Sequence, residues 1–220
     1  TWLPSGGYHP ISPVRVLDTR VSGGPIRQGE TRPLGMLSTA GIPAAGVSAV
    51  AANITITGGT ASSFLTVSPT GFSRPTASTL NWLPNQTRSN LAQTALGIYG
   101  AVSFFNAAGS VDLVVDVVGW YDDGGVQRPG GSEFHALTPS RILDTRNAIG
   151  SVNEPLGAGE TRSLTVAGHG GVPASGATAA VINVTATDST APSFLTVWPA
   201  GEARPEASSL NWPEGATRPN

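Results

Sequence analysis

Residues 63–82 read SFLTVSPTGFSRPTASTLNW, and residues 193–212 read SFLTVWPAGEARPEASSLNW. Fourteen of the twenty positions are identical, at a constant offset of 130 residues. Each copy has an apolar run, then a middle rich in Gly and Pro, then Leu-Asn-Trp, a pattern typical of two strands joined by a loop. The duplication therefore predicts two similar β-rich domains in tandem.

The similarity extends upstream, with one change of spacing. Asp-Thr-Arg at 18–20 recurs at 144–146, an offset of 126, whereas Gly-Glu-Thr-Arg at 29–32 recurs at 159–162, an offset of 130. The second copy therefore carries four extra residues around 147–156, where a surface loop is expected because loops tolerate insertions.

These matches divide the chain into a first repeat over residues 8–121, a Gly-rich linker over 122–133 and an incomplete second repeat over 134–220. The second repeat has no counterpart of residues 91–121, which in the first repeat hold about three strands' worth of apolar alternation. A sandwich without them leaves a core face uncovered. We expect either further repeats beyond Asn220 or a protein partner that supplies the missing strands by β-augmentation.

Strand periodicity is clearest over Ser48–Thr57, where Val50, Ala52, Ile54 and Ile56 fall on one face. Other strands are expected at 14–17, 31–37, 64–68, 78–82, 88–98, 102–106 and 111–121. No capped stretch shows the period of a helix. Eight strands in about 114 residues predict an all-β fold of tandem β-sandwich or jelly-roll-like domains, the second lacking its last strands.

Composition excludes several classes of partner. Charged residues make up 12% of the chain and the net charge is −2, so there is no basic surface for nucleic acid or for an anionic membrane. No apolar run reaches the length of a membrane span. There is no cysteine, so neither disulfides nor a cysteine zinc site is expected.

The Asp-Thr-Arg tripeptide suggests a fixed ion pair. Asp18 and Arg20 are two residues apart and so share a face of a strand whose neighbours are apolar. A partly buried carboxylate needs a partner, and Arg binds it in a bidentate manner. We expect structural ion pairs between Asp18 and Arg20 and between Asp144 and Arg146; ligand binding is the alternative.

Two other sets of ionisable residues do not form a catalytic pattern. Asp112 and Asp116 lie on one strand face about 13 Å apart, beyond the separation of glycosidase carboxylates. Asp116 is instead expected to pair with an Arg of its own repeat. His9, His135 and His169 lack the companions of a zinc site or of a nucleophile elbow, and we expect packed or surface histidines.

The duplicated stretch contains the candidate ligand site. Its shared polar and aromatic residues are Arg74, Asn81 and Trp82, with the copies Arg204, Asn211 and Trp212. Sugar sites combine an aromatic face with fixed polar groups. The alternative is a core Trp with a capping Asn. An exposed Trp indicates a glycan module, and a buried one indicates a spacer.

The combined motifs support a family resemblance. RVLDTR or RILDTR is followed by GIPA or GVPA, ANITIT or INVTAT, the duplicated stretch and, once, VDLVVDVVGWY. This chain resembles the LDTR-type repeats of secreted and cell-surface proteins of actinobacteria and related bacteria. The resemblance covers nearly the whole chain and implies an extracellular, non-catalytic β-domain found in tandem or beside cell-wall hydrolase domains.

Together these observations predict an extracellular binding or attachment module for cell-wall or surface glycan. The alternative is a structural spacer or assembly unit that makes protein–protein contacts, including by strand complementation. No enzymatic activity, catalytic residue, metal site or cofactor is expected.

Overall fold

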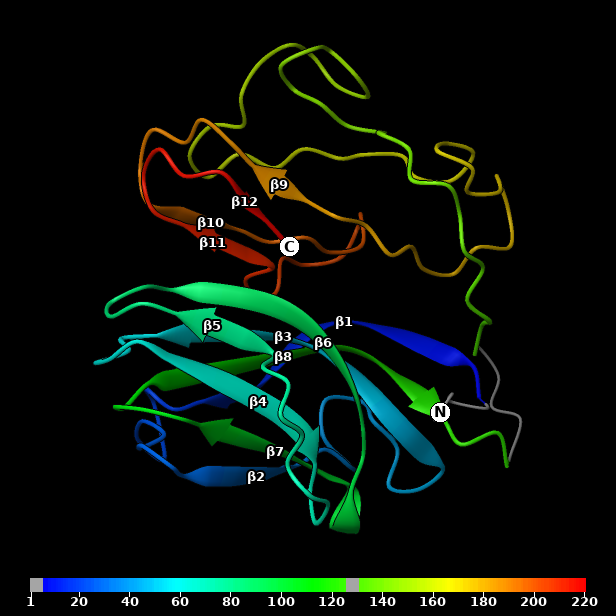
Figure 1. Ribbon diagram of the computed structural model, residues 1–220. Helices are drawn as coiled ribbons and strands as arrows, with labels where there is room; N and C mark the ends of the chain where they lie inside the picture. The colour runs from blue at the N-terminus through cyan, green and yellow to red at the C-terminus, as the bar shows by residue number, and fades with distance from the viewer. Residues whose placement is uncertain (1–5, 126–130) are drawn as a thin grey trace. The chain divides into compact units, whose positions relative to one another are not determined.

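The computed structural model describes residues 6–125 and 131–220. These residues form strands, turns and loops (Figure 1). The chain divides into two units, Thr1–Ser132 with Asn183–Asn220, and Glu133–Ile182. The single helical element in the described residues is a 3-10 turn, η1 (Ile98–Gly100). The all-β prediction is confirmed.

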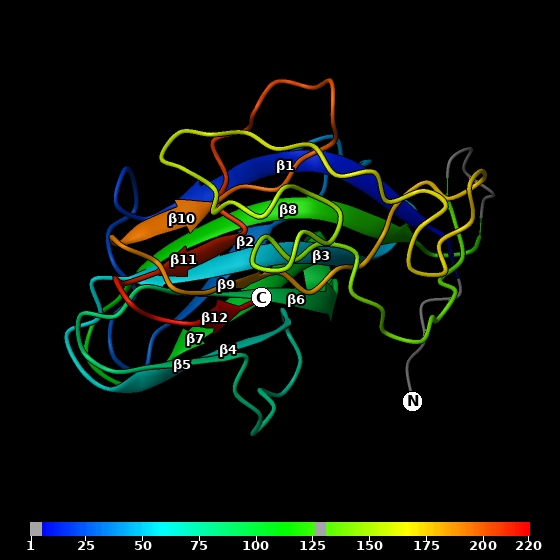
Figure 2. The ribbon, with the colours of Figure 1, turned by 90° about the horizontal axis from the view of Figure 1, so that it is seen from above.

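The first repeat contains eight strands in two antiparallel sheets. They are β1 (Tyr8–Asp18), β2 (Thr31–Gly35), β3 (Val47–Thr57), β4 (Ser63–Pro69), β5 (Leu80–Trp82), β6 (Arg88–Ala95), β7 (Ala101–Asn106) and β8 (Asp112–Asp122). The long sheet has the order β1-β8-β3-β6, seen side by side in Figure 2, and the short sheet has the order β2-β7-β4-β5.

The strand order identifies the sandwich as a jelly roll. β1 pairs with β8, β2 with β7, β3 with β6 and β4 with β5. The chain is thus one long antiparallel ribbon rolled into two layers, which is the arrangement of an eight-stranded jelly roll.

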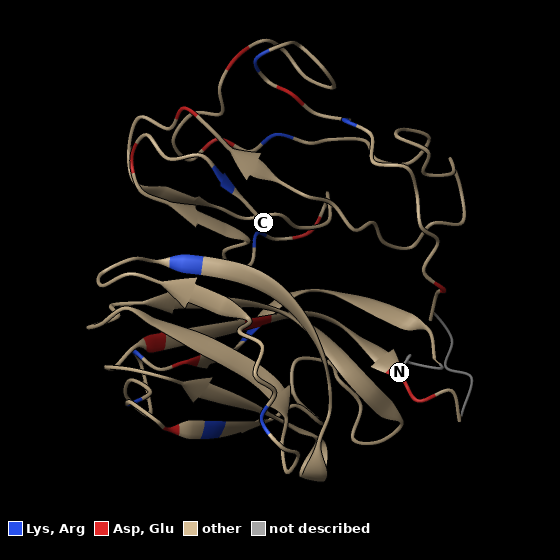
Figure 3. Cartoon of the chain, viewed as in Figure 1, with Lys and Arg blue, Asp and Glu red and all other residues tan. Residues whose placement is uncertain are grey.

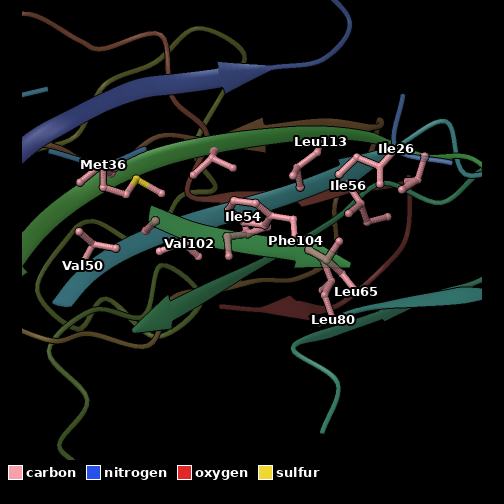
Figure 4. Packing of buried hydrophobic residues seen from close by; sticks show 14 of the residues in the cluster. Ile26, Met36, Val50, Ile54, Ile56, Leu65, Leu80, Val102, Phe104 and Leu113 are labelled. Carbon is pink, nitrogen blue, oxygen red and sulfur yellow. The ribbon is translucent and has the colours of Figure 1, made fainter. Parts of the chain in front are cut away.

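The core lies between the two sheets and follows the predicted alternation. Val50, Ile54 and Ile56 of β3 are each at most 1% exposed. They pack with residues of the short sheet such as Leu65 and Phe104 (Figure 4). Because strand side chains alternate, one face of β3 supplies this layer, as predicted.

One strand is longer than predicted. β1 begins at Tyr8 instead of Val14, and Tyr8 lies opposite Tyr121 of β8. Pro10 and Pro13 interrupt the alternation of apolar and polar residues, so the sequence does not indicate the first part of this strand. The edge position of β1 accommodates them, with a shift of register between Pro10 and Val14.

The second copy forms only four short strands in the described residues. These are β9 (Thr185–Ala186), β10 (Ser193–Leu195), β11 (Leu210–Trp212) and β12 (Arg218–Pro219). They pair as two separate ribbons, β12-β9 and β10-β11. Residues 133–182 are all described and contain one isolated bridge, between Asp144 and Ile149, but no strand.

The pairing in the first repeat explains this difference. Among the strands of the described residues, β1 has β8 as its single neighbour and β2 has β7. Residues 134–220 include no equivalent of β7 and β8, so the segments corresponding to β1 and β2 lack the neighbour with which a ladder could form among these residues. The tandem arrangement of two sandwiches therefore stays a prediction.

The predicted linker is bound to β1 near its end, whereas the predicted insertion loop is exposed to solvent. Residues 126–130 of the linker lie outside the described residues. Near its end, Ser132 forms two backbone hydrogen bonds with Tyr8, of 2.8 and 3.0 Å. The insertion loop at 147–156 is exposed over most of its length, as expected of a surface loop.

Candidate functional site

The indole of Trp82 lies in the core and not on the surface. It is 4% exposed and belongs to the buried apolar cluster. A Cβ atom at Gly59 would lie 2.5 Å from Trp82 Nε1, so the missing side chain there makes room for the ring. Leu80 and Trp82 share one face of β5. Of the two alternatives for Trp82, the structure therefore has the buried one, and its indole offers no exposed face to a sugar.

The side chain of Asn81 faces outward and fixes its own loop. Its Nδ2 donates to Ser78 Oγ at 2.9 Å. The second copy repeats the contact, with Asn211 Nδ2 donating to Ser208 Oγ at 3.0 Å. The shared Ser and Asn therefore hold the start of a strand in both copies.

Arg74 stacks on an aromatic ring of the short sheet. Its guanidinium carbon lies 3.9 Å from the ring centroid of Phe105 on β7, a cation–π contact. The same ring lies 6.2 Å from that of Phe64 on β4, tilted by 50°. Phe105 thus contacts both Arg74 and Phe64.

The second copy, within the described residues, places no aromatic ring against Arg204. Arg204 is exposed there, and Trp212 is half-buried with an enclosed Nε1 that has no hydrogen-bond partner. In neither copy do the predicted Arg, Asn and Trp side chains gather around one exposed aromatic face.

The predicted ion pairs of the Asp-Thr-Arg tripeptides are present in both copies. Arg20 binds Asp18 in a bidentate manner, with Nη2 and Nε at 2.6 and 2.8 Å from the two carboxylate oxygens. Arg146 binds Asp144 in the same way, with both distances 2.9 Å. Arg141 adds a third contact to Asp144 at 2.7 Å.

A second Arg links this corner to a buried carboxylate. Arg15 binds Asp116 of β8 through Nε at 2.9 Å and Nη2 at 3.2 Å, and its Nη1 lies 3.5 Å from Asp18. Asp116 is 1% exposed, so Arg15 compensates a charge removed from water. Figure 3 shows how sparse the charges are elsewhere, with both signs present.

Thr19 connects β1 to the start of β8, a role that the sequence did not indicate. Its Oγ1 donates to Asp112 at 2.8 Å and accepts from the N–H of Leu113 at 2.8 Å. The side chain is 2% exposed. Its repetition in both tripeptides was the available signal, but the partners lie more than ninety positions away.

His9 is a packed histidine. Its ring stacks on Trp120, with centroids 3.9 Å apart and planes 3° from parallel. Its Nε2 lies 2.9 Å from Asp122 Oδ2. Burial alone would raise the pKa of Asp122, but hydrogen bonds from His9 and from the N–H groups of Gly124 and Gly7 outweigh it and leave that pKa below its usual value.

Carboxylates with lowered pKa values predict acid sensitivity. The pKa of Asp18 is lowered chiefly by its hydrogen bonds with Arg20, and that of Glu30 by the N–H of Arg27. A folded-state pKa below the unfolded one adds stability at higher pH that is lost on acidification. We expect the urea midpoint to fall as the pH drops below about 4, where carboxylates protonate, and Asp122→Asn to reduce the fall. A midpoint that rises with acid would contradict this.

The outer face of the long sheet is buried around one amide. The alternation of β3 places Asn53 on the face opposite the core, yet Asn53 is 4% exposed. Its Nδ2 donates to the carbonyl of Ser208, and its Oδ1 accepts from Asn220 Nδ2 at 3.1 Å. Asn220 Oδ1 in turn accepts from the N–H of Leu91 on β6 at 3.1 Å. Within this unit, Ser208 and Asn220 of the second copy therefore cover the outer face of β3 in the first repeat.

A polar hollow of about 250 Å³ lies beside this contact. It is lined by Arg15, Arg20, Thr55, Thr57, Thr87, Val114, Ser208 and Asn211. The hydroxyl of Thr55 is buried and has no hydrogen-bond partner. Of the predicted ligand-binding residues, Asn211 alone lines this hollow.

The sequence did not indicate Asn53 as a contact residue. The polar side of an amphipathic strand is normally solvated, and only the recurrence of Asn at 53 and 183 marked it. No helix in residues 6–125 and 131–220 is long and apolar enough to cross a membrane. Comparisons of the chain with protein-family models, with curated proteins and with solved structures found no match.

Proposed function

We propose that the chain is a non-catalytic, extracellular structural module whose repeats hold to one another through protein–protein contacts. The observation that carries this proposal is the buried amide of Asn53. Both ends of its carboxamide bind residues of the second copy, Ser208 and Asn220. A buried amide with both ends bonded fixes register between two surfaces, because losing either partner leaves a costly unsatisfied group.

The use of the shared motif residues supports the same function. Trp82 is buried, Asn81 binds within its own loop, and Asp18 is paired with Arg20. The residues that the two copies share thus stabilise each copy. Repeated residues that serve the stability of their own domain favour a structural module over a binding site for a soluble ligand.

Asn53→Ala tests the proposal in the full chain. It removes the donor to the carbonyl of Ser208 and one of the two acceptors of Asn220 Nδ2, which also donates to the carbonyl of Ser209. We expect amide hydrogen exchange in β9–β12 to speed up on the order of tenfold while exchange in the first repeat is unchanged. Asn81→Ala is the matched control, because that amide contacts only Ser78. Unchanged exchange in Asn53→Ala would overturn the proposal.

Glycan binding is the second candidate, favoured by the polar hollow. Thr55 lines it together with Arg15, Arg20 and Asn211, and such polar groups suit the hydroxyls of a sugar. Retention of the chain on cell-wall polysaccharide that is lost in Thr55→Val would favour this candidate. No retention on any glycan would exclude it.

A further inference from the structure

The loop between β4 and β5, residues 70–79, folds back over the outer face of the short sheet. Thr66 Oγ1 of β4 donates to the carbonyl of Ala77 at 3.1 Å, and the hydroxyls of Thr70 and Ser103 lie 2.8 Å apart. Thr66 and Ser103 point away from the core, yet they are only 1% and 7% exposed. The loop is therefore fixed to the sheet by its own side chains.

This loop carries a guanidinium that no carboxylate neutralises. Arg74 stacks on Phe105, and within residues 6–125 and 131–220 it has neither a hydrogen bond nor an ion pair. Residues 63–87 contain no other charged side chain, and β7 contains none. The cation–π contact orients the guanidinium and leaves its N–H groups available for a ligand. An isolated positive charge on an uncharged surface is complementary to a single negative charge.

An aromatic ring and an amide oxygen lie on the same face of the sheet. The ring of Phe64 is half-buried, and its centroid is 6.2 Å from that of Phe105. Asn81 lies directly opposite Phe64 in the ladder of β4 and β5, so their Cβ atoms are about 5 Å apart. Asn81 Nδ2 binds Ser78, whereas Asn81 Oδ1 accepts no hydrogen bond within the described residues. The neighbouring strands β5, β4 and β7 therefore bring an amide oxygen, a ring and a guanidinium to one surface (Figure 1).

The equivalent loop of the second copy has the opposite charge. Glu202 and Glu206 stand where the first repeat has Phe72 and Thr76, at the offset of 130. The net charge of the loop is therefore +1 over residues 70–79 and −1 over residues 200–209. Two carboxylates beside Arg204 repel an anion that the first repeat attracts, so the combination of groups is specific to the first repeat.

We propose that this face of the first repeat binds an acidic saccharide, with a uronic acid as the recognised unit. The sugar carboxylate accepts two hydrogen bonds from Arg74, as Arg–carboxylate pairs commonly do. The pyranose ring lies against Phe64, and a sugar hydroxyl donates to Asn81 Oδ1. An acidic peptide uses the guanidinium alone, whereas a sugar uses all three groups. This inference is independent of the Asn53 contact and of the polar hollow.

The test titrates the full chain with tetragalacturonic acid and, in parallel, with its methyl ester, which keeps the sugar rings but removes the charges. Isothermal titration calorimetry should show saturable binding of the acid and about tenfold weaker binding of the ester, because the charge-assisted hydrogen bonds are lost. Arg74→Gln should weaken binding of the acid about tenfold for the same reason. Arg204→Gln is the matched control in the second copy and should leave binding unchanged.

Two further variants test the other groups of the site. Phe64→Leu keeps an apolar side chain but removes the aromatic face, and Asn81→Ala removes the amide oxygen. Each should weaken binding a few-fold, and urea unfolding verifies that every variant is folded. These variants keep the proposal testable if Arg74→Gln does not fold.

Four results would overturn the proposal. The first is no binding of tetragalacturonic acid by the native chain, and the second is equal binding of the acid and its ester. The third is an equal loss of binding in Arg74→Gln and Arg204→Gln. The fourth is binding of poly-L-glutamate as tight as that of tetragalacturonic acid, because that result assigns the site to acidic peptides.

Discussion

Trp82→Ala lowers the free energy of unfolding by about 3–5 kcal/mol, the range for removal of a large aromatic side chain from a core. Trp82 is 4% exposed and packs within the cluster that both sheets share. The cavity left by the indole cannot collapse easily, since interiors are close-packed. Urea unfolding followed by far-ultraviolet circular dichroism measures the loss.

Trp82→Phe separates packing from hydrogen bonding at this position. The ring is largely kept, and the buried Nε1 has no hydrogen bond to lose. The cost should therefore be well below that of Trp82→Ala. If Trp82→Ala unfolds at the same urea concentration as the native chain, the core role of this residue is refuted.

Arg15→Met destabilises the first repeat by about 3 kcal/mol, because breaking a pair with a buried carboxylate leaves its charge uncompensated. The two Arg15 contacts with Asp116 measure 2.9 and 3.2 Å. The methionine keeps the aliphatic stem that packs beside β8, so the loss reports the charge. Chemical denaturation at pH 7 gives the difference.

The same substitution in an Asp116→Asn background is the control. With the charge of residue 116 removed, Arg15→Met should cost about 1 kcal/mol, close to the value of an ordinary hydrogen bond. The difference between the two costs is the coupling energy of the pair. Equal costs in both backgrounds would show that Arg15 does not act through Asp116.

Local patterns predicted the layer that faces the core. The alternation over Ser48–Thr57 placed Val50, Ile54 and Ile56 on one face, and these residues are buried there. The opposite face could not be predicted in the same way. Asn53 is buried by Ser208 and Asn220, more than 150 positions away, and no local period carries that information.

The candidate site illustrates a different limit. A Trp next to an Asn at the end of a strand suits both a sugar platform and a core residue, because the side chain is amphipathic. The packing of Trp82 against the opposite sheet decides between them. For the second copy, the repeat predicted strands before β9 as well, but residues 133–182 form no strand in the structure, because a local pattern does not show whether a pairing partner is present.

The rolled pairing of the first repeat also governs the order in which it can fold. His9 and Asp122, which meet at one end of the long sheet, are 113 positions apart. As the chain is synthesised, β1 must wait for the final strand of its own repeat, and such non-local pairing folds slowly. Where similar repeats follow one another, an unpaired first strand can meet the final strand of a neighbouring repeat, so a late-pairing first strand makes such an array open to domain swapping.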